Sequence, residues 1–177
     1  MGKNYTYSLT DTIYSIRLIF ILTITFFITV LISSPLAAQQ KISEINSYIS
    51  AIEDSNKTSE LESLVYNVQP TVYLNNGTFD PKGEGAMRVA SVNANEIEKL
   101  KQGHSSLQSV RLLLISFKNL QELQAFRLQP ANIGSMPNLA YVILSLGFEG
   151  APAEMFSGIQ GFDESEIVFL FESAKPF

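Results

Sequence analysis

Apolar side chains recur every three or four positions in the segment that follows residue 38. This spacing places them on one side of an α-helix, and the polar stretch 54–59 interrupts it. The positions concerned are Ile42, Ile45, Tyr48, Ile49, Ile52, Leu61, Leu64 and Val65. The pattern predicts two short helices, and we assign residues 39–69 to an N-terminal helical segment.

After Pro70 the pattern changes to short apolar runs separated by turn-forming residues. Runs of β-branched and aromatic residues that are bounded by Asn, Asp, Gly or Pro are typical of strands. They predict strands at 71–74, 87–92 and 166–172, turns at 75–77 and 80–85, and a short helix at 95–102 that ends at Gly103. The last strand is expected to close the sheet.

Three segments in the second half of the chain can be laid over one another. They begin at Leu107, Leu123 and Leu139, 16 residues apart, and each continues as Leu-x-x-apolar-x-Leu. In two copies the match extends three positions upstream, to Leu120 and Met136. A fixed period with the same apolar positions filled is the signature of stacked repeats. The pattern predicts repeat strands at 107–112, 123–128 and 139–144.

A single amphipathic helix over 107–128 is the alternative to the first two repeats. The apolar residues of this stretch also recur at threes and fours, and Gln121, Glu122 and Gln124 favour a helix. We favour strands because residues 110–117 are largely apolar in succession, and residues 142–146 repeat this behaviour after a proline.

The repeated frame resembles the leucine-rich repeat family. The closest stretch is 132–144, Asn-Ile-Gly-Ser-Met-Pro-Asn-Leu-Ala-Tyr-Val-Ile-Leu, and the resemblance covers about residues 105–145. It implies one short strand of a parallel sheet per repeat, with the leucines in the core and the positions between them on the concave side. The period of 16 is shorter than the 20 to 29 residues of that family, which favours a small sheet with tight returns over a regular horseshoe.

Residues 1–38 have the pattern of a bacterial signal peptide. An uncharged apolar run of 15 residues, 18–32, follows Arg17 and precedes Pro35 and the small residues Ala37 and Ala38. A membrane-spanning helix needs about 20 apolar residues, so this run is short for one. We expect cleavage after Ala38 and an extracytoplasmic location, whether secreted, periplasmic or at the cell surface. The alternative is an uncleaved anchor that also leaves the domain outside.

The composition excludes several classes of function. Residues 39–177 are enough chain for one domain. The sequence contains no cysteine, which rules out disulfides, thiol catalysis and cysteine zinc sites. The formal net charge is −5, whereas proteins that bind duplex nucleic acid carry a basic surplus. We therefore expect no nucleic-acid partner.

Candidate catalytic or metal-binding residues are few. The single histidine, His104, follows Gly103 in a predicted loop, where a solvated residue is the better interpretation. The carboxylates of Asp163, Glu164 and Glu166 precede the final strand and are expected in a solvated turn. The sequence has no nucleophile elbow, phosphate-binding glycine loop or zinc-ligand spacing. We predict no catalytic residue, no metal site and no cofactor.

One candidate binding surface follows from the repeat. If the leucines of the frame are buried, the residues between them face the other side of the sheet, with Arg111 and Arg127 side by side on neighbouring strands. Arginine and tyrosine are enriched at protein interfaces. The predicted binding residues are Ser109, Arg111, Arg127, Tyr141 and Ile143. The alternative is that a helix from about 42–64 covers this face and that the arginines pair with its glutamates.

The sequence as a whole predicts an α/β fold, with a small, mainly parallel sheet that forms a leucine-rich-repeat-like solenoid fragment. Residues 70–177 form this domain, behind the N-terminal helical segment. We expect an exported, non-enzymatic binding module that recognises a protein or another ligand through a sheet face. The alternative is a structural or accessory envelope protein, which would contact the membrane only through an uncleaved leader.

Overall fold

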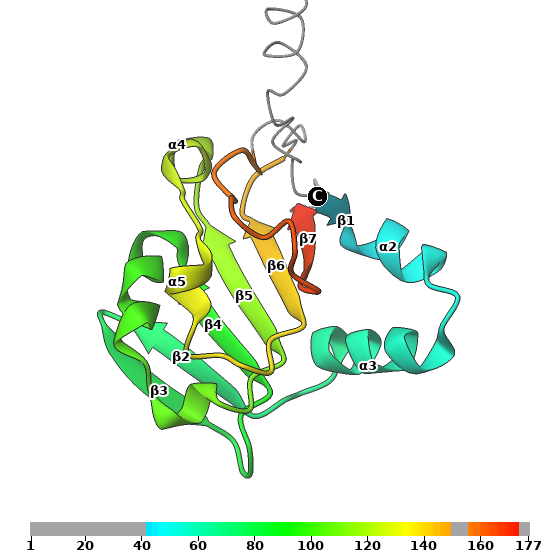
Figure 1. The fold of residues 1–177 in the computed structure, drawn as a ribbon, viewed down its shortest axis with the longest axis horizontal. Helices are drawn as coiled ribbons and strands as arrows, with labels where there is room; N and C mark the ends of the chain where they lie inside the picture. Colours follow the sequence, from blue (N-terminus) through cyan, green and yellow to red (C-terminus); the bar gives the residue numbers. More distant parts are fainter. Residues whose placement is uncertain (1–41, 150–155, 174–177) are drawn as a thin grey trace, which may run out of the picture. The chain divides into compact units, whose positions relative to one another are not determined.

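A computed structural model describes residues 42–149 and 156–173 of the chain. Within these residues seven strands form one sheet (Figure 1): β1 Ile42–Glu44, β2 Thr71–Asn75, β3 Thr78–Lys82, β4 Val89–Asn93, β5 Leu112–Phe117, β6 Tyr141–Leu146 and β7 Val168–Ser173. Their order in the sheet is β1-β7-β6-β5-β4-β2-β3. Every neighbouring pair is parallel except the hairpin β2–β3. The predicted α/β class and the mainly parallel sheet are confirmed.

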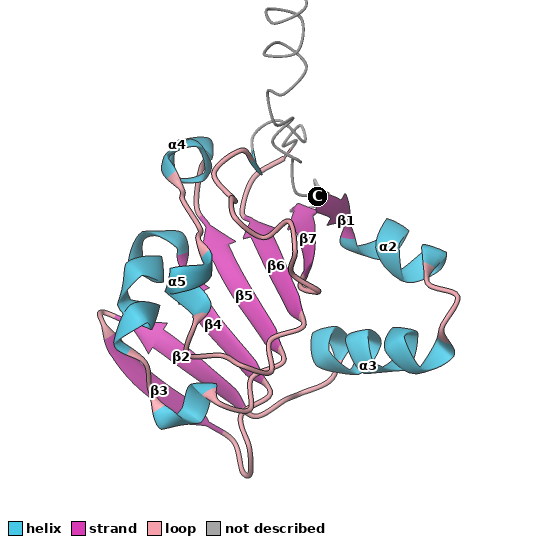
Figure 2. Ribbon diagram, in the orientation of Figure 1, coloured by secondary structure: helices cyan, strands magenta, loops and turns pink. Residues whose placement is uncertain are grey.

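Short helices connect the strands (Figure 2): α2 Ile45–Ala51, α3 Ser55–Tyr66, the 3-10 helices η1 Ala94–Gln102 and η2 Ser105–Leu107, α4 Leu120–Ala125 and α5 Pro130–Ile133. Their ends follow local sequence. Asp54 begins α3 by accepting hydrogen bonds from two backbone amides of the first turn, and Asn119 caps α4 in the same way. Two short helices, α2 and α3, lie within the predicted N-terminal helical segment, and the break between them falls at 52–54.

The larger hydrophobic core lies between one face of the sheet and the helices η1, η2, α4 and α5. Alternate residues of each strand point into it, as in Leu113, Ile115 and Phe117 of β5. The helices contribute residues such as Leu100 and Leu123, which are also buried. The connections from β4 to β5 and from β5 to β6 thus lie on one face of the sheet.

The opposite face of the sheet packs against α2 and α3. A second cluster joins Ile45, Leu61 and Leu64 of these helices to sheet residues that include Leu112 and Ile143. Because neighbouring positions of a strand face opposite sides, the apolar succession Leu112-Leu113 supplies both cores. The two clusters explain why the central strands read as continuous apolar runs.

The antiparallel hairpin turns at Asn76 and Gly77, which both have positive φ. Two positive φ values in a two-residue loop match the twist of the strands that it joins, and Asn-Gly adopts them at little cost. The following strand, β3, runs through Lys82, so the prediction of a turn over 80–85 is wrong at its start. Pro81 and the charges of Asp80 and Lys82 lie on this edge strand, where they oppose pairing with another chain.

Several predicted elements are confirmed with shifted ends. The strands expected at 71–74, 87–92 and 166–172 are β2, β4 and β7, and the helix expected at 95–102 is η1. The last strand does not close the sheet at an edge, because β7 lies between β6 and β1. Residues 42–44, which were expected in a helix, form β1.

The prediction of three strands with a period of 16 is wrong. The segment 107–112 runs from the last residue of η2 to the first residue of β5. The segment 123–128 contains the end of α4 and an isolated parallel bridge from Leu128 to Ile159. Only 139–144 falls mainly in a strand, β6. The alternative of one helix over 107–128 is also wrong, because β5 runs through its middle. The resulting spacing from β5 to β6, measured between the paired residues Leu112 and Tyr141, is 29 residues.

The predicted leader, residues 1–38, lies outside the described ranges. Among the helices of 42–149 and 156–173, none has the length and apolar character needed to cross a membrane.

Candidate functional site

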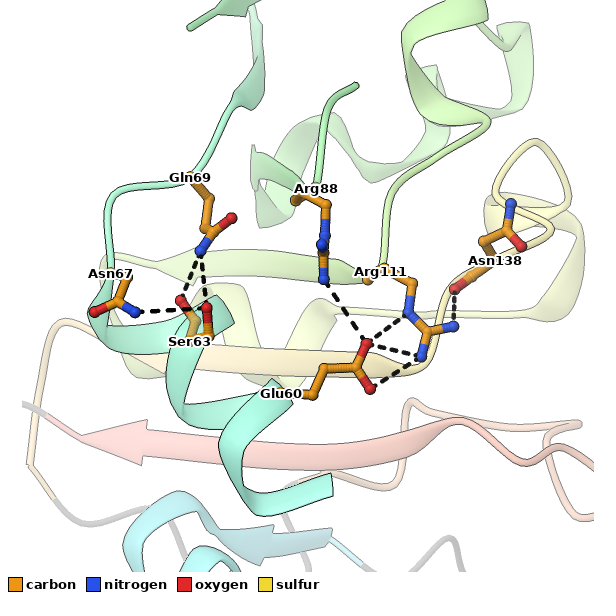
Figure 3. A network of polar contacts seen from close by, with 7 residues as sticks. All are labelled: Glu60, Ser63, Asn67, Gln69, Arg88, Arg111 and Asn138. Carbon is orange, nitrogen blue, oxygen red and sulfur yellow. Dashed lines mark hydrogen bonds and ion pairs between the residues drawn. The ribbon is translucent and has the colours of Figure 1, made fainter. Parts of the chain in front are cut away.

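The predicted binding residues begin with Arg111, which directly precedes β5 at the sheet face covered by α3. Its guanidinium donates from Nε to Glu60 Oε1 at 3.0 Å and from a terminal nitrogen to Oε2 at 3.2 Å (Figure 3). A second terminal nitrogen donates to the carbonyl oxygen of Asn138 at 3.2 Å. Arg88, which precedes β4, lies 3.8 Å from the same carboxylate. This network ties the middle of α3 to the amino-terminal ends of β4 and β5.

The pairing of Arg111 with Glu60 corresponds to the alternative in which a helix covers the face and its glutamates bind the arginines. Two other predicted residues, Tyr141 and Ile143 of β6, lie on this face and are buried in the cluster with α2 and α3. Burial raises the pKa of the Tyr141 phenol, and the negative charge of Glu60 adds to the effect while Arg111 opposes it. These residues form a packed interface within the chain.

The remaining predicted residues lie elsewhere. Arg127 is not beside Arg111: it follows α4, is exposed, and donates to the backbone carbonyls of Gln124 and Phe126. The strand that was expected to carry it does not form, which is why the two arginines are not neighbours. Ser109 lies before β5 and donates to the carbonyl oxygen of Met87 at 2.9 Å. The predicted surface of adjacent arginines is therefore wrong.

The same face of the sheet has a part that α3 leaves uncovered. A pocket of about 370 Å³ lies there, with Tyr73, Ser91 and Leu114 from three successive strands on its floor. Residues 64–65 and 67–69, at the end of α3 and just after it, form one wall, and Glu172 of β7 also lines it. We call this pocket the α3 groove.

The rim of the α3 groove carries apolar side chains that face solvent. Val68 is fully exposed, and Tyr73 has an exposed fraction of 39%. Tyr66 is 60% exposed and lies in a shallow hollow that shares Asn67 with the groove. Apart from Leu120, these are all the large apolar residues that are exposed in the described part of the chain. Their gathering at one place marks this surface as a candidate interface.

The sheet face that carries the groove changes from apolar to polar residues toward the carboxyl ends of the strands. Leu114 is paired in register with Ser91 on one side and with Ile143 on the other. Two positions further toward the carboxyl ends, the residues on the same face are Asn93, Ser116, Ser145 and Glu172, which pair in succession across four strands. Of these four residues, Glu172 lines the groove.

Other candidates for chemistry do not assemble into a site. His104 is exposed, accepts a hydrogen bond from the amide of Ser106, and stacks on Phe79 at 5.1 Å between ring centroids. Asp163, Glu164 and Glu166 are exposed. Within 42–149 and 156–173, no three His, Asp or Glu side chains are grouped so as to hold a metal ion. Among the described residues, the α3 groove is the candidate surface that remains.

Of the residues that line the α3 groove, sequence reasoning named Ile143 as a binding residue and missed the others. Tyr73 was placed in a strand, and its position between the inward Val72 and Leu74 was a signal that it faces the other way. Val68 lies alone among polar residues, and no pattern in its neighbourhood marks it. Comparisons with protein-family models, with curated proteins and with solved structures find nothing that matches this chain.

Proposed function

We propose that this protein is an exported, non-enzymatic binding module that recognises a polypeptide partner through the uncovered part of its sheet, the α3 groove. The observation that carries the proposal is that the exposed side chains of Val68 and Tyr73 line this groove, while exposed Tyr66 lies in the adjoining hollow. Exposed tyrosine beside aliphatic surface is the composition that protein interfaces favour. Isolated exposed apolar residues would need no explanation, but a contiguous group at a hollow does.

The incomplete covering of the sheet also supports a binding role. Mostly parallel sheets are normally covered on both faces, since their strands are apolar on both sides. Here η1, η2, α4 and α5 cover one face, whereas α2 and α3 leave Leu114 and Ser91 only half-buried on the other. A partner that docks in the groove would complete this layer.

The edges of the sheet are less suited to a partner. The β3 edge carries Pro81, which has no amide to donate, and the ion pair of Asp80 with Lys82 at 3.0 Å. The other edge, β1, has three residues. Either edge therefore offers few backbone hydrogen-bonding groups to an added strand, and we favour docking on the face of the sheet.

We also propose a leucine-rich-repeat-like character for the strands, in a register that differs from the predicted one. Val110, Leu113 and Ile115 are buried in the larger core at the same relative positions as Leu139, Val142 and Leu144. The strands from β2 through β4, β5 and β6 to β7 are adjacent in the sheet in chain order, as in a solenoid. The antiparallel β3 and the cover of α2 and α3 depart from that family.

Export is part of the proposal and has its own test. Sequencing the amino terminus of the protein recovered from outside the cytoplasm should give Gln39 as the first residue. A retained leader would instead support the anchored envelope protein, and recovery in the cytoplasm alone would contradict both forms.

The binding role is tested by photo-crosslinking in the producing cells. A photo-reactive amino acid is placed at Ser91, on the floor of the groove, and in a control at Gln121, which is exposed on α4 at the opposite face. We expect discrete protein adducts from Ser91 that disappear when Val68→Asp is added, and none of these adducts from Gln121. Equal adducts from both sites, or adducts that Val68→Asp leaves unchanged, would refute the proposal.

A further inference from the structure

We propose that the segment bound in the α3 groove is a basic amphipathic helix, whose apolar side faces Leu114 and Val68 and whose lysines or arginines face Glu172 and Glu62. This inference rests on the proposed function and names the chemistry of its partner. Two features carry it: the space beside α3, and the charge around the groove.

The space beside α3 suits a second helix. An α-helix with its side chains is about 10 to 12 Å across, and strands of six residues such as β5 and β6 are about 20 Å long. One helix across these strands thus covers about half of their length. The contacts of Glu60 place α3 near their amino-terminal ends, and the groove lies beside its carboxyl-terminal end, over sheet residues from Val89 and Leu112 to Leu114. Helices dock in such apolar grooves through side chains spaced by three and four residues.

The charge of the groove selects a basic helix. Glu172 is half-buried on β7, lines the groove, and forms no ion pair with a described residue. A carboxylate that is partly removed from water beside apolar surface gains from a cationic partner more than an exposed carboxylate does.

The surface of α3 next to the groove is also negatively charged. Glu62 is exposed on α3 and lines the hollow that it shares with Tyr66 and Asn67. Over residues 42–69 the sequence has five acidic side chains and one basic one, Lys57. The chain as a whole has a formal charge of −5. This field attracts a basic segment and repels an acidic one or an anionic membrane surface.

The arginines closest in sequence to the floor strands do not offset this field. Arg111 and Arg88 lie at the amino-terminal ends of β5 and β4, where both face Glu60. On β3, Lys82 is paired with Asp80. Of the cations that precede or flank the strands of the floor, Arg88, Arg111 and Lys82 have carboxylate partners within the chain, whereas Lys118, which follows β5, is exposed and forms no ion pair with a described residue.

The test uses three synthetic 18-residue peptides labelled with a fluorophore, and fluorescence anisotropy with the full chain in a mild nonionic detergent. The first peptide has leucine at helical spacing with lysine elsewhere, the second replaces lysine by glutamate, and the third has the composition of the first with alternating leucine and lysine. We expect the first to bind most tightly. Its affinity should fall on the order of tenfold in the double variant Glu62→Gln with Glu172→Gln, and it should weaken with added salt.

The control variant removes two exposed carboxylates away from the groove, Glu149→Gln with Glu164→Gln, and should change the affinity less than twofold. Glu62→Gln alone, at an exposed position of α3, keeps the test valid if Glu172→Gln disturbs folding. A loss of affinity in the control as large as that in the groove variant would assign the binding to net charge and overturn the inference.

The remaining outcomes separate the two proposals. If the acidic or the alternating peptide binds as tightly as the first and loses its affinity with Val68→Asp, the groove binds polypeptides but the basic helix is wrong. If no peptide responds to Val68→Asp, both the basic helix and the proposed function are overturned.

Discussion

The network around Glu60 should hold α3 on the sheet, and Glu60→Gln tests this. The Glu60 and Arg111 side chains are 30% and 36% exposed, and two hydrogen bonds join them side by side. A charge-assisted hydrogen bond contributes about 1.5 to 3 kcal/mol when protected from water, and an exposed ion pair about 0.2 to 1 kcal/mol. For this intermediate exposure we expect Glu60→Gln to lower the free energy of unfolding by about 1 to 2 kcal/mol.

A double-mutant cycle in urea distinguishes the two arginines. The coupling energy between Glu60→Gln and Arg111→Met should be about 1 kcal/mol, since this pair has parallel hydrogen bonds. The coupling with Arg88→Met should be below about 0.5 kcal/mol, because its nitrogen lies 3.8 Å from the carboxylate. The Nε of Arg88 is also buried without a hydrogen bond to any described residue, so replacing Arg88 should cost little.

The reasoning would be refuted if the coupling with Arg111 were below about 0.3 kcal/mol, or if Arg88 were coupled more strongly than Arg111. Either result would mean that α3 is held by its apolar contacts alone. Leu61→Ala gives the scale of those contacts, because Leu61 is fully buried and a leucine-to-alanine change in a core costs about 2 to 5 kcal/mol.

Three further predictions concern single positions. Asn132→Ala removes a buried amide that joins α5 to η1, so urea unfolding should show a loss of about 1 to 3 kcal/mol, and a loss below about 0.5 would contradict this. A Cβ at Gly158 would overlap a backbone carbonyl oxygen, whereas Gly134 has room and helical φ, so Gly158→Ala should lower the melting temperature and Gly134→Ala should not. Because burial raises the pKa of Tyr141 above its usual value of 10.0, the folded state keeps the phenol proton longer, and stability should fall as pH rises above about 10; Tyr141→Phe should reduce this fall.

The elements with clear local signals were predictable from sequence. Alternation in 71–74 and 87–92 and the apolar run 166–172 correspond to β2, β4 and β7, because period-two patterns depend on neighbours within the strand. The short strand β1 gave no such signal. Its three residues pair with β7, more than 120 positions later in the chain, and only that distant partner makes them a strand.

The repeat failed because its register was ambiguous. Residues 112–115 are apolar in succession, so a frame that puts Leu112 in the larger core fits the sequence as well as one that uses Leu113 and Ile115. The structure has the second arrangement, and Leu112 faces α3. A strand buried on both faces loses the alternation that would fix its register. The helix α4 then occupies the place of the expected second strand, where Asn119 provides a cap.

The position of α3 explains why the candidate site moved from the arginines to the groove. Glu60 and Arg111 are 51 residues apart, so no local sequence pattern predicts their contact. The sequence offered the glutamates of this helix as partners of the arginines only as an alternative. Because α3 packs on this face, Arg111 pairs with Glu60, and Tyr141 and Ile143 are buried in the cluster with α2 and α3. The sheet surface at Ser91 and Leu114 is only half-buried. The helix α3, which packs against the predicted binding residues, therefore also forms one wall of the groove.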